Sequence, residues 1–257
     1  CDVVHLHWVA RFLDYQSFFA NVPSRKPVVW TLHDMNAFTG GCHYSGGCER
    51  YTEKCGHCPQ LASTQDKDPS RQIWRRKHDG YAHLAPERFH IVTPSRWLAE
   101  QVRRSSLLGR FPVTAIPNGV STNDYAPRDR HFARDTLGLP WDAAVLLFVA
   151  EHTDVRRKGL SLLLDALVRL NYSGKLVLVS LGSLKHIPHG RFPHVHLGTV
   201  FNERLLSLVY SAADLFVIPS LEDNLPNTVL EAMACGVPVA GFDVGGIPEM
   251  VRPGRTG

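Results

Sequence analysis

The feature that most constrains the fold is a regular alternation of short apolar strands with helices in the second half of the chain. Each strand and the helix after it occupy about 20 to 30 residues, the spacing of βα units in a Rossmann-like domain. Continuous apolar runs of this length are typical of strands buried in a parallel sheet. We expect strands at 144–150, 175–182, 194–198, 215–219 and 237–240, and helices at 160–170, 202–212 and 228–235.

The first half shows the same alternation, so a second α/β domain is expected. Its predicted helices include one that begins after Ser95, a good N-cap residue. Residues 116–142, between the halves, are rich in Pro, Gly, Asn and charge, which is typical of a linker. The predicted elements are strands at 3–9, 28–33 and 90–93 and helices at 68–84 and 96–105. The predicted domains are 1–120, with a cysteine-rich loop at 39–61, and 143–257, joined by a linker at 121–142.

Charge and hydropathy narrow the class of protein. The 257 residues have a net charge of +4, an excess that fits nucleotides or a lipid surface but is too small to indicate nucleic acid. No apolar run approaches the roughly 20 residues of a bilayer span, and no signal pattern opens the chain, so we expect a cytoplasmic protein. The chain opens on the β-rich run "CDVVHLHWV" and stops on the loop-like "RPGRTG", so we expect a fragment truncated at both ends.

Two loops of the second half carry groups that suit a phosphorylated ligand. In open parallel sheets, ligands bind beyond the carboxyl ends of the strands. The loop "DVRRKG" follows the strand at 144–150 and supplies Arg156, Arg157 and Lys158, whose cations suit a diphosphate. The loop "DVGGIPEM" follows the strand at 237–240, and its glycine pair lets the backbone approach a ligand closely.

A third loop, "SLEDNLPNTVLEAMACG", follows the strand at 215–219 and leads into a helix. Pro226 stands at the helix start, Asn227 or Thr228 can cap it, and its free N–H groups favour an anion. Glu231, one turn in, is placed to accept hydrogen bonds from sugar hydroxyls. The alternative is an ordinary capped helix whose Glu231 faces solvent. We expect the three loops to converge at one edge of the sheet.

The sequence resembles the retaining nucleotide-sugar glycosyltransferases of family 4, of the bacterial polysaccharide-biosynthesis type with a cysteine-rich insert. The motifs that carry the resemblance are "PSLEDNLPNTVLEAMACGVPVAGFDVGGIPEMV", the preceding "RKG", and "IPNGV" between the halves. It covers essentially the whole chain. The resemblance implies the GT-B fold, in which two Rossmann-like, doubly wound domains face a cleft, the first on the acceptor side and the second binding the nucleotide sugar.

The resemblance also implies roles for single residues. Glu231 would bind the nucleotide ribose, and the basic pair that stabilises the leaving diphosphate would be Lys158 with Arg157 or Arg156. Family members usually have two glutamates flanking seven residues, and here Asp223, preceded by Glu222, takes the first place. Three residues before the helix would offer backbone groups to the phosphates and donor sugar: Asn224, Leu225 and Asn227.

On the acceptor side, the resemblance places a cleft-facing histidine after a strand, and "WTLHDM" puts His33 there. The alternative is a neutral histidine satisfied at a strand end. The neighbouring Asp34 is interpreted as a loop cap, and His5 and His7, which alternate on the first strand, as structural residues.

The activity implied is transfer of a sugar from a nucleoside diphosphate sugar to an acceptor hydroxyl, with retention of configuration and without a catalytic metal. The acceptor would be a glycan, a polysaccharide or a lipid-linked sugar, and the last would place the protein at the inner face of the membrane. The alternatives are a nucleotide-sugar epimerase of the same fold and a non-catalytic, zinc-stabilised binding module.

The loop at 39–61 holds four of the six cysteines, Cys42, Cys48, Cys55 and Cys58. Four thiolates close a tetrahedral zinc site, which is structural because no coordination position remains for substrate. His43 or His57 could replace a cysteine, and free thiols or disulfides remain alternatives. The Gly and Pro flanks of the C-x-x-C do not fit a redox motif at a helix start. A metal here would hold a loop beside the acceptor site.

The predicted helix at 71–83 is strongly basic and carries three large apolar residues. It could contact an anionic lipid surface as a peripheral attachment, or it is a solvated helix with an apolar inner stripe. The sequence leaves both interpretations open.

Overall fold

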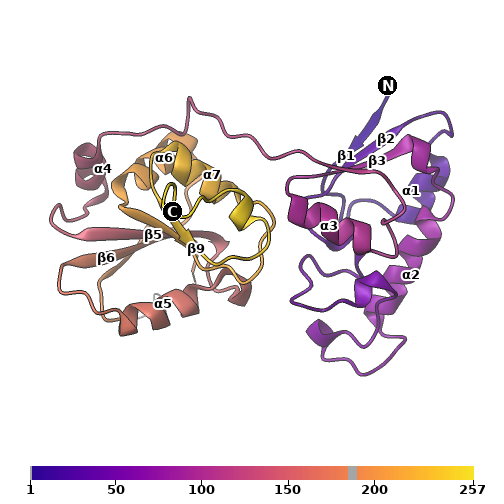
Figure 1. The fold of residues 1–257 in the computed structure, drawn as a ribbon, viewed down its shortest axis with the longest axis horizontal. Coiled ribbons are helices and arrows are strands. Elements are labelled where there is room, and N and C mark those ends of the chain that lie inside the picture. Colours follow the sequence, from indigo (N-terminus) through magenta and orange to yellow (C-terminus); the bar gives the residue numbers. More distant parts are fainter. Residues whose placement is uncertain (1, 185–189) are drawn as a thin grey trace. The chain divides into compact units, whose positions relative to one another are not determined.

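The computed structural model describes residues 2–184 and 190–257, and these residues form two compact units, Cys1–Pro117 and Asn118–Gly257 (Figure 1). Each unit has its own parallel sheet and its own apolar core. Both sheets therefore have the α/β organisation that the alternating pattern predicts.

The first unit contains a four-stranded sheet in the order β1-β2-β3-β4, and every neighbouring pair is parallel. Trp30, Tyr81 and Phe89 are fully buried and pack edge to face in its core. The strands are β1 (Val4–Leu6), β2 (Val28–Thr31), β3 (Phe89–Thr93) and β4 (Val113–Ala115), and the helices are α1 (Tyr15–Asn21), α2 (Pro69–Tyr81) and α3 (Arg96–Arg104).

The helix starts of this unit follow local chemistry. Asp68 caps α2, where its carboxylate accepts from the Arg71 N–H, and Pro69 occupies the first turn. Ser95 caps α3 by accepting from the Leu98 N–H, so its predicted N-cap role is confirmed. Helix α1 and strand β4 lie outside the predicted elements, since they have only seven and three residues.

The second unit contains a five-stranded parallel sheet in the order β7-β6-β5-β8-β9. The chain runs outward from β5 through β6 to β7 and then returns to the other side of β5 with β8, so the strand order reverses there. The strands are β5 (Ala144–His152), β6 (Leu176–Ser183), β7 (His194–His196), β8 (Leu215–Ile218) and β9 (Val239–Gly241). Ligands of open α/β sheets bind at such a reversal.

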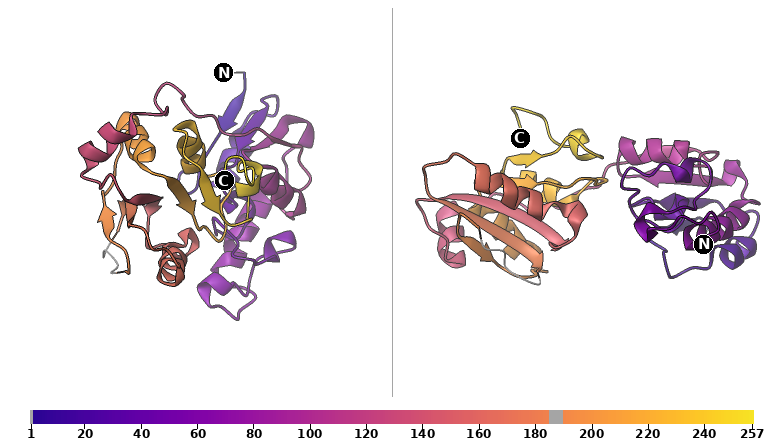
Figure 2. Two further views of the ribbon diagram at one scale, coloured as in Figure 1. Left: turned by 60° about the vertical axis from the view of Figure 1, so that its left-hand side comes forward. Right: turned by 90° about the horizontal axis from the view of Figure 1, so that it is seen from below.

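Helices cover both faces of this sheet (Figures 1 and 2). One apolar cluster joins α5 to one face, and the other face packs against α4, α6 and α7. The alternation of β5 side chains accounts for this, since Leu147 belongs to one cluster and Phe148 to the other. The helices are α4 (Arg130–Leu137), α5 (Leu160–Arg169), α6 (Glu203–Ala212) and α7 (Asn227–Ala234).

The segment 121–142, expected to be a linker, contains helix α4 and packs on the second unit. Asp129 caps the helix, and Gly138 ends it in a left-handed conformation. The buried Arg134 donates to the carbonyls of Ala212 and Ala143 and pairs with Asp214 at 2.7 Å. In the described parts of the chain, no helix has the length and apolar character needed to cross a membrane.

Candidate functional site

The three loops expected to converge do meet in the second unit. Strand β8 pairs with β5 on one side and with β9 on the other, all parallel, so the carboxyl ends of the three strands share one edge. The backbone joins the loops directly: the Leu221 N–H donates to the Arg157 carbonyl at 2.8 Å, and the Gly246 N–H donates to the Asp223 carbonyl at 3.0 Å. The predicted site residues of this unit therefore lie on connected loops.

Asp223 is the centre of this loop cluster. Its side chain is 7% exposed, and its Oδ2 atom lies 2.7 Å from Lys158 Nζ and 3.3 Å from Arg157 Nη1. The Ser220 hydroxyl donates to the same oxygen at 3.2 Å. Burial acts to raise the pKa of Asp223, but the two cations more than offset it, so this pKa lies below its ordinary value. The carboxylate is thus charged at neutral pH and holds two cations at the sheet edge.

Two glycines allow the loops to approach this closely. Gly159, with φ of 75°, ends the turn that carries Lys158, and a Cβ there would lie 1.9 Å from the carbonyl oxygen of Pro219. Gly245, with φ of 60°, is equally tight, since a Cβ would lie 1.8 Å from the Asp223 carbonyl oxygen. Both positions need glycine for space as well as for conformation.

The start of α7 differs from the prediction. Neither Asn227 nor Thr228 caps the helix, because the N-cap residue is Pro226, which makes no side-chain cap bond. Asn227 is the first helical residue, and its Oδ1 accepts from the side-chain amide of Asn118 at 2.9 Å. The helix therefore begins without a side-chain cap on its N–H groups, directly after the buried residues Asn224 and Leu225.

Glu231 lies one turn into α7 and is partly buried rather than facing solvent. The Tyr210 hydroxyl donates to its Oε2 at 2.7 Å. Burial raises the pKa of Glu231, and the nearby Glu203 acts in the same direction. Tyr210 was not identified from the sequence, and it holds one of the two oxygens of this carboxylate in place.

The basic loop separates its arginines by exposure. Arg157 is partly buried and donates to the Glu222 carbonyl at 2.6 Å as well as pairing with Asp223. Arg156 is exposed. The buried Thr153 donates its hydroxyl to the Ser183 carbonyl at 2.9 Å. Of the two arginines that the sequence left open, Arg157 is therefore the one placed beside Lys158 and Asp223.

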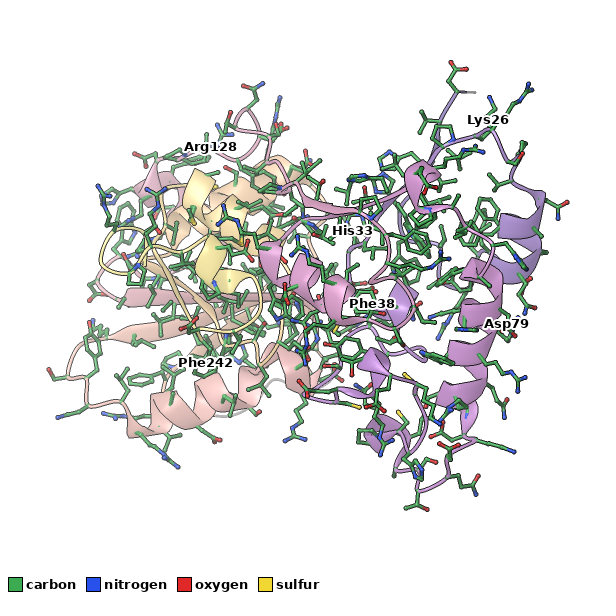
Figure 3. All side chains as sticks on the ribbon, turned by 45° about the vertical axis from the view of Figure 1, so that its right-hand side comes forward. Lys26, His33, Phe38, Asp79, Arg128 and Phe242 are labelled. Carbon is green, nitrogen blue, oxygen red and sulfur yellow. The ribbon has the colours of Figure 1, made fainter. Side chains whose placement is uncertain are left out.

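His33 of the first unit (Figure 3) follows β2 and lies in a group of polar rings at the ends of β1 and β2. Its Nε2 lies 3.1 Å from Nδ1 of His7. Burial and the neighbouring His7 lower the pKa of His33, although Asp34 acts against them. Both histidines line a cavity of about 20 Å³ with Trp8 and Asp34. His7, interpreted from the sequence as structural, is thus a direct neighbour of the candidate site residue.

Asp34 does more than cap a loop. Its Oδ1 accepts from the Asn36 N–H at 2.7 Å, as a cap does. Its Oδ2 accepts from the Trp8 indole at 3.2 Å and lies 2.8 Å from Nδ1 of His43. Asp34 therefore joins the segment after β1, which carries Trp8, to the loop that carries the cysteines.

The four cysteines of that loop, Cys42, Cys48, Cys55 and Cys58, all line one cavity of about 30 Å³ and are free thiols. Figure 3 shows yellow sulfur atoms in the lower part of the first unit, beneath the labelled Phe38. Across residues 2–184 and 190–257, no three His, Cys, Asp or Glu side chains are arranged to hold a metal ion. The expected zinc site is therefore not formed by the thiols as they lie. Burial raises the pKa of Cys42 and raises that of Cys55 to about 11.

The basic helix α2 uses several of its cations inside the unit. Arg71 donates to the Cys55 carbonyl and pairs with Asp66. Arg76 pairs with Asp14 at 2.9 Å, and Lys77 is buried. These contacts support the interpretation of a structural helix over that of a lipid-binding one.

Comparison with solved structures identifies the fold. The chain superimposes on HepE of Anabaena, solved in complex with UDP-glucose, with a TM-score of 0.63 and 20% identity over 98% of this chain and 62% of HepE. The likeness shows the fold, which is GT-B: two Rossmann-like α/β units, each with a parallel sheet.

Sequence comparison relates part of the chain to a known family. Residues 143–257 match the family described as "Glycosyl transferases group 1". D-inositol 3-phosphate glycosyltransferase 2 of Catenulispora acidiphila is 33% identical over 65% of this chain and 43% of its own length. The putative colanic acid biosynthesis glycosyl transferase WcaC of Escherichia coli is 28% identical over 92% of this chain and 57% of its own. The chain thus spans about half the length of these relatives.

Proposed function

We propose that the protein transfers a sugar from a nucleoside diphosphate sugar to an acceptor hydroxyl with retention of configuration. The observation that carries the proposal is the buried Asp223 carboxylate with Lys158 and Arg157 beside it, at the point where the strand order of a group 1 glycosyl transferase domain reverses. The UDP-glucose complex of HepE and the proposed pathway of WcaC are consistent with a nucleotide-sugar donor and a glycan acceptor.

The donor would occupy the second unit. Its diphosphate would take Lys158 and Arg157 as partners, because these cations have the charge and the partial exposure to reach it. The uncapped N–H groups at the start of α7, after Asn224 and Leu225, would add donors to the same anion. As the glycosidic bond to the diphosphate breaks, charge grows on the leaving oxygen, and fixed dipoles and cations stabilise it there.

The ribose would bind at Glu231. Tyr210 donates to Oε2 of this carboxylate, which fixes its orientation and leaves Oε1 to accept from a ribose hydroxyl. Arg156, which is exposed at the loop edge, would contribute charge near the diphosphate without a fixed contact. Asp223 would face the donor sugar while it keeps the two cations in place.

The acceptor would bind at the first unit, beside His33. With its pKa lowered by burial and by His7, this imidazole is neutral at pH 7 and can accept a hydroxyl proton or a hydrogen bond. We propose that His33 contacts the transferred sugar or the acceptor hydroxyl. A glycan, polysaccharide or lipid-linked sugar supplies such a hydroxyl, and no step here needs a metal ion.

A nucleotide-binding measurement on this chain tests the donor site. We expect saturation-transfer NMR with UDP, ADP and GDP, alone and as their sugar conjugates, to detect contact with at least one nucleotide. Lys158→Met should weaken the binding of the best nucleotide at least tenfold, about 1.4 kcal/mol. Glu231→Gln should weaken the binding of that nucleotide less than Lys158→Met does. It should hardly change the binding of the 2′,3′-dideoxy nucleotide, which lacks the ribose hydroxyls.

The control is Lys175→Met, which removes an exposed lysine that pairs with Asp142. Both residues lie just before the amino ends of β6 and β5, away from the carboxyl ends that carry the candidate site. Equal losses in Lys158→Met and Lys175→Met would refute the placement of the diphosphate. A chain that contacts no nucleotide is a binding module of another kind. Conversion of the donor sugar without an acceptor would favour an epimerase.

A further inference from the structure

The cysteine loop at 39–61 has no part in the proposed transfer, yet it places four thiols on one small cavity. We propose that Cys42, Cys48, Cys55 and Cys58 close around one structural zinc ion, and that this metal fixes the loop carrying His43 against Asp34. The inference rests on the first unit alone and is independent of the donor site.

The donor set is the first argument. Four cysteines within seventeen residues, two of them a C-x-x-C, match the ligand type and count of closed structural zinc sites. The second observation is spatial, because all four line the same cavity although up to sixteen residues separate them along the chain. Its volume of about 30 Å³ exceeds the roughly 10 to 15 Å³ that a cavity needs to hold one water molecule, and a zinc ion is smaller than a water molecule.

The backbone around the C-x-x-C is already held in a tight turn. Gly56 and His57 both have positive φ, of 131° and 47°. The Cys58 N–H donates to the Asp68 carboxylate at 2.8 Å, and the Gly40 N–H donates to the Cys55 sulfur at 3.1 Å. An N–H···S contact of this kind stabilises a thiolate more than a thiol. These contacts hold the turn independently of the four sulfurs' positions around a metal.

Binding of zinc requires the four sulfurs to move closer together. Metal–sulfur bonds in such sites are about 2.3 Å long, and within residues 2–184 and 190–257 no three metal-binding side chains are arranged to hold an ion. Rotation about χ1 moves a sulfur while its backbone stays fixed. The cavity between the side chains is the space into which the four sulfurs would turn.

The buried ammonium of Lys77 would offset the negative charge of a zinc–thiolate site. Four thiolates around one dication leave an excess of negative charge, which is costly to bury without a partner. Lys77 is 2% exposed, and Cys42 and Cys55 lie near enough to act on its pKa. Its Nζ donates to the carbonyls of Asn36 and Thr39, at the base of the loop. Among the described residues, Lys77 forms no ion pair with a carboxylate.

The loop is joined to the acceptor-side group by three contacts. The Met35 N–H donates to the His43 carbonyl at 2.9 Å, and the Asn36 side-chain amide donates to the Gly41 carbonyl at 2.8 Å. His43 in turn lies 2.8 Å from Asp34. Metal at the four cysteines would therefore hold Asp34, the residue after His33, in its present position.

The test is metal content of the whole chain, purified without chelator from zinc-supplemented medium. We expect about one zinc per chain by plasma mass spectrometry. Replacement of zinc by Co²⁺ should give the intense visible absorption of tetrahedral thiolate coordination. Cys55→Ser and Cys58→Ser should each lose at least tenfold in zinc affinity, whereas Cys235→Ser, a buried cysteine of the second unit, should keep full occupancy.

Variants that fail to fold do not decide the question, so the wild-type chain is also titrated with a strong chelator. Removal of zinc should lower the thermal midpoint and speed amide exchange of residues 35–43, while leaving exchange of β5 unchanged. A wild-type chain without metal after supplementation would overturn the proposal. So would a mass lower by two hydrogens per bond, which indicates disulfides, or Co²⁺ that binds without thiolate absorption.

Discussion

Replacing Asp223 with asparagine separates the two roles of the cations beside it. In the wild type, Lys158 and Arg157 are held by a carboxylate only 7% exposed. Asparagine keeps the shape and one acceptor oxygen but removes the charge. Breaking a fully buried ion pair costs about 3 to 5 kcal/mol, whereas exposed pairs contribute about 0 to 1 kcal/mol. The cation side chains are 23% and 26% exposed, so they can rehydrate in part. We therefore expect the second unit to lose about 1 to 3 kcal/mol.

The same substitution should act in the opposite direction on ligand binding. Without the carboxylate, both cations are available to a diphosphate, and we expect UDP-type nucleotides to bind several-fold more tightly. If Asp223 also contacts the donor sugar, the gain should be smaller for the nucleotide sugar than for the bare nucleotide. A variant that is less stable but binds the nucleotide better is the expected result.

The pH dependence has a definite sign. Because the pKa of Asp223 lies below its ordinary value near 3.8, the carboxylate stabilises the fold at pH values above that point. This stabilisation is lost as the pH falls through the folded-state pKa. The stability difference between wild type and Asp223→Asn should therefore be constant from about pH 8 to about pH 5 and should shrink below about pH 4.

Urea unfolding followed by amide hydrogen exchange measures the effect, because exchange of β5 and β8 peptides reports on the second unit alone. Asp243→Asn is the matched control, since it removes an exposed carboxylate from the loop after β9. Equal stability of Asp223→Asn and wild type within about 0.5 kcal/mol would refute the reasoning, as would a difference that grows at acidic pH.

Two further predictions concern His33 and Gly159. Because burial and His7 lower the pKa of His33, its neutral form stabilises the first unit above about pH 6.5 and this contribution is lost as the pH falls. His33→Gln should flatten the decline in first-unit stability between about pH 7 and pH 5, measured by amide exchange of β2; an unchanged slope would contradict this. Gly159→Ala should cost the second unit about 3 kcal/mol in urea unfolding, from steric overlap and positive φ together. Gly138→Ala, with φ of 65° and open space around it, should cost only about 1 kcal/mol, and equal losses would exclude the overlap with Pro219.

The sequence predicted the long elements because period and length agreed there. Strand β5 has nine residues and helix α5 has ten, long enough for each apolar pattern to be recognised, and both elements lie where expected. Helix α1 has seven residues and β4 only three, too few for a periodic signal. Helix α4 was hidden because its surroundings are rich in Pro and Gly, and the contacts of its buried Arg134 come from distant residues.

The candidate site was predictable where it depends on strand order and not where it depends on side-chain partners. The loops after β5, β8 and β9 meet because parallel strands bring their carboxyl ends to one edge. The Tyr210–Glu231 bond joins two helices, and no local pattern marks it. His7 and His33 meet because β1 and β2 are neighbours in register, which an isolated strand pattern does not reveal. The predicted cap at Asn227 was wrong, because Asn227 is the first helical residue and its side chain accepts a hydrogen bond from Asn118.

The contacts of segment 118–142 decide where this chain can be divided. The stretch that matches the glycosyl transferase family begins at residue 143, yet Arg128 and Ala126 bond to Ser211 and Ser207 of α6 through their N–H groups. A separately expressed piece beginning at residue 143 would lose α4, expose the apolar face of α6, and leave Asp214 without either of its arginine partners. A piece beginning at Asn118 keeps all three. The start of the family match and the start of the second compact unit are therefore about 25 residues apart.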